Sequence, residues 1–127
     1  MYLIGDIGNT AIKICLFNNN LKLIKNIKIH KKNINKKFIL QELLFLKNYS
    51  SKINKILFSS VVPNSYKIIK KIIKKITKLN CEELKNYNLK KFINIKVNRK
   101  QIGSDRLANA IAVIDNKSNY IVVDFGT

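Results

Sequence analysis

Residues 2–17 read YLIGDIGNTAIKICLF, and this stretch decides the fold. Tyr2–Asp6 is a short apolar run, which suits a buried strand. Ala11–Phe17 alternates between two faces, and Leu21–Ile29 alternates again after Asn18–Asn20, where asparagine tolerates the backbone of a tight turn. The sequence therefore predicts that three antiparallel strands open the chain.

Helices and strands alternate along the rest of the chain. Leucines at helical spacing predict a helix over Phe38–Lys47, and a stripe of isoleucines opposite a row of lysines predicts a second over Tyr66–Leu79. Between them, Ile56–Val62 is apolar enough for a strand that is covered on both faces, and Pro63 stops it. The first two thirds of the chain thus combine a sheet with two helices.

The last third is less regular. Short strands are predicted at Glu82–Leu84 and Ile93–Val97, a helix from Gly103 to about Asp115, and a final strand over Tyr120–Asp124. This order of elements indicates the α/β class with a mixed sheet. Because the chain stops directly after a strand-to-turn motif, we interpret it as part of a longer protein.

Composition is consistent with one domain, since 127 residues with 46% hydrophobic content can build a single core. Cys15 and Cys81 show no CxxC spacing and no histidine partner, which favours reduced thiols over a metal site or a disulfide. The start of the chain is not typical of a signal peptide, and no window approaches the ~18 apolar residues of a membrane helix. A soluble, cytoplasmic protein without a membrane partner is expected.

The net charge of +18 would suit a partner such as nucleic acid. However, only Arg99 and Arg106 are arginines, and the lysines are spread along the whole chain. Arginine makes the specific contacts to guanine and phosphate. A solvated lysine surface without a specific nucleic-acid partner is therefore favoured, and a basic nucleic-acid-associated or regulatory protein remains the alternative.

The first motif with chemical meaning is Asp6-Ile7-Gly8-Asn9-Thr10, followed by Lys13. A glycine in such a turn lets backbone amides approach a phosphate, and Lys13 can reach the same loop. The carboxylate of Asp6 repels phosphate, so its natural use is to hold a hydrated Mg²⁺ that bridges phosphates. The plain alternative is an ordinary hairpin turn.

Two further motifs follow later in the chain. Asp124-Phe125-Gly126-Thr127 is again a strand end with an acid, a glycine and a hydroxyl, and two such loops can grip a nucleotide across a cleft. Gly103-Ser104-Asp105-Arg106 opens a helix, where Asp105 could be merely a cap. It could also take a proton from an attacking hydroxyl while Arg106 holds an acidic substrate.

Together these stretches resemble the type III pantothenate kinase family. The family pattern has Asp-x-Gly-Asn-Thr-x-x-Lys, Gly-x-Asp-Arg and Asp-x-Gly-Thr in this order, and Ser59–Pro63 is similar to its Ser-Ser-Val-Val-Pro strand end. The resemblance implies a ribonuclease H-like fold of the actin/hexokinase type, with residues 1–117 as the first domain. Residues 118–127 would be the first strand of a second, truncated domain.

The resemblance also implies residue roles in ATP-dependent phosphorylation of pantothenate, the first step of coenzyme A biosynthesis. The ATP site would comprise Asp6, Ile7, Gly8, Asn9, Thr10, Ala11, Ile12, Lys13 and Thr127. Substrate would contact Gly103, Ser104, Asp105 and Arg106, with Asp105 as the catalytic proton acceptor. Asp124 would bind K⁺ or NH₄⁺, and the full-length protein would be a homodimer.

One position departs from the family pattern. Upstream of Gly-x-Asp-Arg the family usually carries Asn-Ile-Arg-Tyr, whose tyrosine contacts the substrate, whereas this chain reads Asn94-Ile95-Lys96-Val97. Val97 cannot supply a phenolic hydroxyl. The visible residues also represent only the first half of the family pattern, so these 127 residues alone are expected to be inactive.

Overall fold

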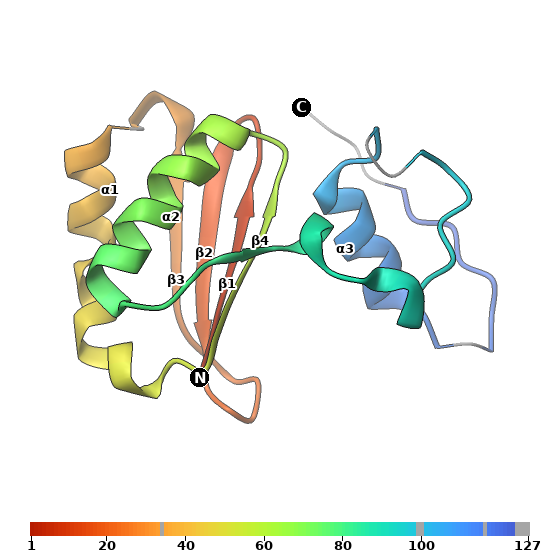
Figure 1. Cartoon of the computed structure of the whole chain (residues 1–127), viewed down its shortest axis with the longest axis horizontal. Coiled ribbons are helices and arrows are strands. Elements are labelled where there is room, and N and C mark those ends of the chain that lie inside the picture. Colours follow the sequence, from red (N-terminus) through yellow and green to blue (C-terminus); the bar gives the residue numbers. More distant parts are fainter. Residues whose placement is uncertain (34, 99–100, 116, 124–127) are drawn as a thin grey trace.

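The computed structural model describes residues 1–33, 35–98, 101–115 and 117–123. Within these ranges the chain forms a five-stranded sheet in the order β3-β2-β1-β4-β5 (Figure 1). The strands are β1 Tyr2–Ile7, β2 Ala11–Phe17, β3 Leu23–His30, β4 Lys55–Ser60 and β5 Glu82–Glu83. The first three are antiparallel, while β4 runs parallel to β1 and β5 parallel to β4. The predicted α/β class with a mixed sheet is confirmed.

The turn between β2 and β3 is longer than predicted. Leu21 has a left-handed φ of 59° and is not part of β3. The side chain of Asn18 accepts hydrogen bonds from the backbone N–H groups of Asn20 and Lys22, at 3.0 and 2.9 Å. These bonds stabilise a turn that extends to Lys22, and β3 begins only at Leu23. Leu21 therefore does not share the buried face of the strand with Ile27 and Ile29.

Two helices and an adjoining 3-10 helix follow the hairpins, namely α1 Lys36–Leu43, η2 Leu44–Lys52 and α2 Pro63–Thr77. The short 3-10 helix η1 Lys31–Asn33 precedes α1. The helix α1 begins before the predicted Phe38, because the side chain of Asn35 accepts the N–H of Phe38 at 2.8 Å and caps its first turn. Similarly, α2 begins at Pro63 and not at Tyr66, since proline is favoured at the first helical position.

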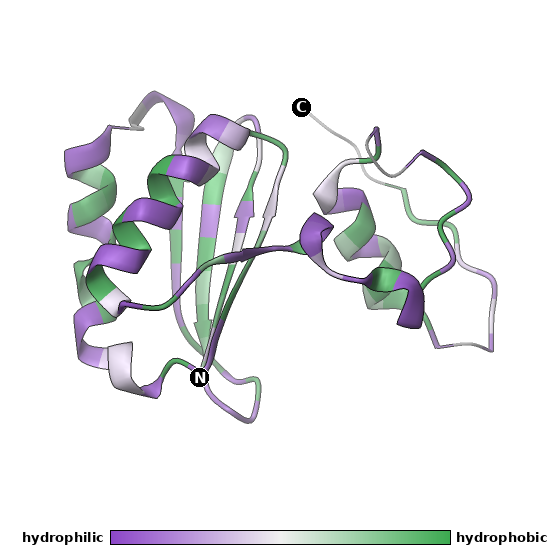
Figure 2. Cartoon of the chain, viewed as in Figure 1, coloured by the Kyte–Doolittle hydropathy of each residue, from purple (hydrophilic) through white to green (hydrophobic). Residues whose placement is uncertain are grey.

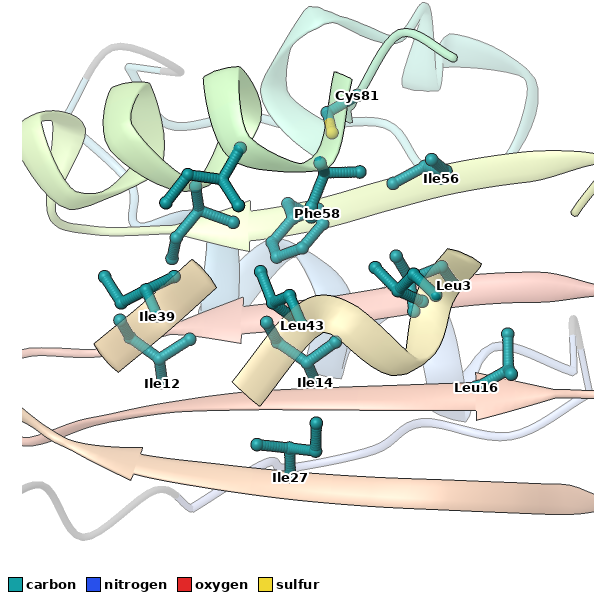
Figure 3. Packing of buried hydrophobic residues seen from close by; sticks show 14 of the residues in the cluster. Leu3, Ile12, Ile14, Leu16, Ile27, Ile39, Leu43, Ile56, Phe58 and Cys81 are labelled. Carbon is teal, nitrogen blue, oxygen red and sulfur yellow. The ribbon is translucent and has the colours of Figure 1, made fainter. Parts of the chain in front are cut away.

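The helices α1 and α2 cover one face of the sheet, and their apolar residues turn toward it (Figures 1 and 2). Ile69, Ile72 and Ile73 of α2 are buried as predicted, whereas Ile68 is 37% exposed. Leu44 is exposed because the chain tightens into η2 at this residue, which moves it off the buried stripe. The main core, part of which is drawn in Figure 3, contains Leu3, Ile7, Ile12, Ile14, Leu16, Ile27, Ile29, Ile39, Leu43, Leu46, Ile53, Ile56, Phe58, Ile69, Ile72, Ile73 and Cys81.

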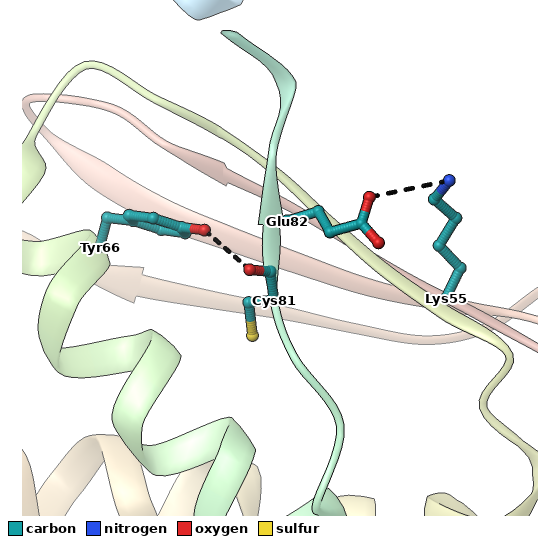
Figure 4. A network of polar contacts seen from close by, with 4 residues as sticks. All are labelled: Lys55, Tyr66, Cys81 and Glu82. Atoms are coloured by element: carbon teal, nitrogen blue, oxygen red, sulfur yellow. Dashed lines mark hydrogen bonds and ion pairs between the residues drawn. The ribbon is translucent and has the colours of Figure 1, made fainter. Parts of the chain in front are cut away.

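Polar contacts attach β5 and the residue before it to β4 and α2 (Figure 4), and an aromatic contact links β4 to α2. The rings of Phe58 and Tyr66 lie 6.2 Å apart, and the Tyr66 hydroxyl donates a hydrogen bond to the carbonyl of Cys81 at 3.2 Å. Lys55 and Glu82 form an exposed ion pair at 3.8 Å. Burial raises the pKa of the Cys81 thiol to about 12, and burial together with nearby Cys81 raises the pKa of Tyr66 to about 12.

The C-terminal segment, defined as residues 84–123, lies against the other face of the sheet from α1 and α2 (Figure 1). It contains η3 Leu84–Asn86, η4 Leu89–Lys91 and α3 Ser104–Val113. The predicted helix is confirmed with slightly shorter bounds. After α3, the Tyr120 hydroxyl donates to Oδ2 of Asp115 at 2.6 Å, which lowers the pKa of that carboxyl group.

Two predicted strands of the C-terminal segment are wrong. Residues 93–97 form no strand, and neither do residues 120–123; Asp124 lies outside the described residues. A strand needs a neighbouring backbone to pair with. In the described ranges no strand pairs with either stretch, and several of their apolar side chains are exposed, among them Val97 at 62% and Ile121 at 93%. The division into domains at residue 117 stays a prediction.

No helix within the described ranges is long and apolar enough to span a membrane.

Candidate active site at the ends of β1 and β4

The first predicted loop is a tight connection between β1 and β2. The N–H of Gly8 donates to the carbonyl of Ala11 at 3.0 Å, and the carbonyl of Thr10 accepts from the N–H of Lys31 at 2.9 Å. Asn9 and Thr10 are exposed at the tip. The loop is therefore held by backbone bonds on both sides, while its tip is accessible to a ligand. Its role in binding ATP stays a prediction.

Three polar residues form a row across the sheet beside this loop. In the strand register, Asp6 of β1 lies opposite Lys13 of β2 on one side and opposite Ser59 of β4 on the other. Side chains alternate along a strand, and Ile7 and Phe58 point into the core. Asp6, Lys13 and Ser59 therefore lie on the face that α1 and α2 do not cover. Lys13 is exposed, and Asp6 and Ser59 are half-buried.

The third predicted motif forms the start of α3. Asp105 is in the first turn, and its Oδ1 accepts the N–H of Arg106 at 2.8 Å. A helix N-terminus favours a negative charge at this position. Ser104 is fully buried, and its hydroxyl donates to Oε1 of Glu83. Sequence reasoning did not identify Glu83, since nothing in the local pattern showed that β5 would meet this helix.

The start of α3 lies against the end of β4. A Cβ on Gly103 would collide with Oδ1 of Asp105 and would lie 3.5 Å from Cγ1 of Val61. Val61 continues the pairing of β4 with β1, because its N–H donates to the carbonyl of Ile7 at 3.1 Å. The structure therefore brings Gly103–Asp105 to the same end of the sheet as Asp6.

An apolar cavity of about 560 Å³ lies on the same sheet face. It separates the sheet from the C-terminal segment and is lined by Tyr2, Ile4, Phe17, Leu21, Lys55, Leu57, Leu84, Tyr87, Leu89, Phe92 and Ile111. The pair Ile4 and Leu57 is two residues before the pair Asp6 and Ser59 in the strand register. The polar row therefore lies at one end of an apolar surface.

The side chains of the described residues suit a hydrated Mg²⁺ better than a metal ion that needs three or more protein ligands. No group of three or more His, Cys, Asp or Glu side chains is present in the described ranges, so they contain no cage of protein ligands. Asp6 supplies a carboxylate beside the loop. Mg²⁺ commonly keeps several waters and uses one or two carboxylates together with substrate phosphates. Asp124 and Thr127, predicted to bind the monovalent cation and ATP, lie outside the described residues.

A family model for type III pantothenate kinase matches residues 2–127. The chain belongs to this family. A type III pantothenate kinase from Pelagibacter ubique is 52% identical over 127 residues, covering 100% of this chain and 51% of that protein. Those from Borreliella burgdorferi and Ehrlichia canis are 36% and 37% identical, covering 98% and 96% of this chain and 48% and 49% of those proteins.

The chain spans about half the length of the curated relatives that it matches. Among solved structures, a candidate N-acetylglucosamine kinase from Porphyromonas gingivalis superposes with a TM-score of 0.46 and 18% identity, covering 65% of this chain and 32% of that chain. The family resemblance predicted from the three motifs is confirmed by the match over residues 2–127.

Proposed function

We propose that a protein combining these residues with the second half found in the relatives phosphorylates pantothenate with ATP. The observation that carries this proposal is the family match over residues 2–127, together with 52% identity to the Pelagibacter ubique kinase along the whole chain. The product would be 4'-phosphopantothenate, the first intermediate toward coenzyme A. A homodimer and a cytoplasmic location are part of the same proposal.

In this proposal the β1–β2 loop holds the phosphates of ATP. Its exposed tip offers backbone and side-chain donors, and Lys13 would offset negative charge on the transferring phosphoryl group. Asp6 would hold Mg²⁺ through water, and that ion would neutralise charge between the β- and γ-phosphates. Thr127 would add a second ATP contact, and Asp124 would bind K⁺ or NH₄⁺.

Asp105 would act as the proton acceptor for the primary hydroxyl of pantothenate. Its Oδ1 already accepts the N–H of Arg106, so Oδ2 is the oxygen that would take the proton. The exposed guanidinium of Arg106 would pair with the substrate carboxylate. Positioning and electrostatics would supply most of the rate enhancement, because phosphoryl transfer needs little covalent help from the protein.

The direct test is phosphorylation of pantothenate by the full-length protein, measured as labelled 4'-phosphopantothenate. We expect product only with ATP, Mg²⁺ and pantothenate all present, and more product in K⁺ or NH₄⁺ than in Na⁺ at equal ionic strength. Residues 1–127 alone should give none. No product from a folded full-length protein would contradict the proposal and would direct attention to Val97, where the family usually carries tyrosine.

The alternative of a nucleic-acid partner rests on the net charge of +18. If the lysines are only a solvated surface, binding to duplex DNA should be weak and should disappear by ~0.2 M salt, because released counterions drive such contacts. Sequence-selective binding that persists at that salt concentration would favour the alternative.

A further inference from the structure

Two adjacent serines end β4, and they are used differently. The hydroxyl oxygen of Ser60 accepts the N–H of Val62 at 3.2 Å, which stabilises the turn from β4 into α2. The hydroxyl oxygen of Ser59 is buried and has no hydrogen-bond partner among the described residues. Ser60 therefore has a structural task, whereas the described fold gives Ser59 none.

A buried hydroxyl without a partner lowers stability, because it has lost its hydrogen bonds to water. Alanine would fit the same strand position without leaving such a group. The Ser59 hydroxyl thus has a hydrogen bond to offer that the described residues do not take up. Unpaired buried groups in native proteins call for an explanation, and a bound ligand is one.

The surroundings of Ser59 indicate which ligand. Its register partner is Asp6, on the face that α1 and α2 leave uncovered, and Lys13 is the next residue in the same row. Two residues further along the chain, Val61 lies close to Gly103. Ser59 is therefore between the predicted phosphate loop and the start of α3. A neutral hydroxyl can donate to an anionic oxygen here without adding negative charge beside Asp6.

We propose that Ser59 is a positioning residue that donates a hydrogen bond to the Mg²⁺–nucleotide held at Asp6. The acceptor is either a γ-phosphate oxygen or a water of the hydrated ion, and both belong to the same ligand. This inference rests on the proposed function, because that function places Mg²⁺ and ATP at Asp6. It assigns a task to the Ser59–Pro63 motif, for which the sequence alone indicated no role.

The test measures binding of the β,γ-imido analogue of ATP with Mg²⁺ to the full-length protein by isothermal titration calorimetry. Ser59→Ala should raise the dissociation constant about three- to tenfold, the range for one lost hydrogen bond. Its thermal midpoint should be unchanged or higher, since an unpaired buried group is removed. The matched control Ser60→Ala should lower the midpoint and leave the dissociation constant unchanged.

Repeating the titration with EDTA identifies the acceptor. If the dissociation constants of Ser59→Ala and the unaltered protein still differ without Mg²⁺, the acceptor is a phosphate oxygen. If that difference disappears, the acceptor is a water on the ion. An unchanged dissociation constant for Ser59→Ala would overturn the proposal, as would a failure of the unaltered protein to bind the analogue. If the unaltered protein binds the analogue but phosphorylates no pantothenate, only the proposed function fails, and the binding comparison still decides the role of Ser59.

Discussion

The body formed by residues 1–83 and the C-terminal segment are stabilised in different ways. In the body, strands and helices share one continuous core that includes Phe58, Ile14 and Ile69. In the C-terminal segment, Leu89 and Leu107 are buried apart from that core, while Phe92, Val97 and Ile121 are exposed. An apolar cavity of about 560 Å³ lies between the two regions. The body therefore has a large core of its own, whereas the C-terminal segment buries few of its apolar residues.

The largest difference between the regions should appear in a matched pair of phenylalanine substitutions. Phe58 is fully buried between β1 and Tyr66, whereas Phe92 is 60% exposed. Phe58→Ala should lower the free energy of unfolding by about 3–5 kcal/mol, because it leaves a cavity in the core. Phe92→Ala should change it by less than about 1 kcal/mol. Urea denaturation of both variants measures this, and equal losses would contradict the comparison.

A smaller effect is expected where the two regions are joined. The buried Ser104 hydroxyl donates to Glu83, which ties the start of α3 to β5. Ser104→Ala should cost about 1–3 kcal/mol locally, because Oε1 of Glu83 loses its partner while Oε2 still accepts the N–H of Lys85. Amide hydrogen exchange should therefore speed up in α3 while β1 and β2 keep their protection. If β1 and β2 lose protection to the same extent, the regions unfold as one unit.

A further effect concerns alkaline pH, where it appears only well above neutrality. The folded-state pKa values of Cys81 and Tyr66 are raised to about 12, so the contribution of both groups to stability is fully present below their ordinary values of 9.0 and 10.0. It is lost as the pH rises toward 12. The free energy of unfolding should therefore fall less steeply above pH 9 in Cys81→Ala than in the unaltered protein. A slope in Cys81→Ala equal to that of the unaltered protein would contradict this prediction.

The same contrast explains what could be predicted from the sequence. The local residue pattern predicts β1 and β2, and a stripe of isoleucines predicts α2. The predicted bounds of each agree with the structure to within a few residues. Residues 93–97 and 120–123 are equally apolar, but apolar sequence does not supply a pairing partner. Strand formation at these stretches depends on the rest of the molecule, which local patterns do not describe.

The candidate site shows a similar division. Asp6 and Asp105 were candidates because each belongs to a motif with glycine nearby, and the structure brings both motifs to one end of the sheet, while their roles stay predictions. Ser59 and Glu83 could not, because their importance depends on which strand lies beside them. An unpaired hydroxyl becomes visible only once burial and register are known. The roles of Asp124 and Thr127 stay predictions.

The central claim is that Asp6 and the start of α3 form one kinase site, and Asp105→Asn in the full-length protein tests it most directly. The substitution keeps the shape of the side chain but removes the proton acceptor. We predict that kcat for pantothenate phosphorylation falls by ~10²–10⁴-fold, the usual contribution of a general base, while affinity for the ATP analogue is nearly unchanged. A fall of less than about threefold would contradict the account and would leave Asp105 as a residue that merely stabilises the first turn of α3.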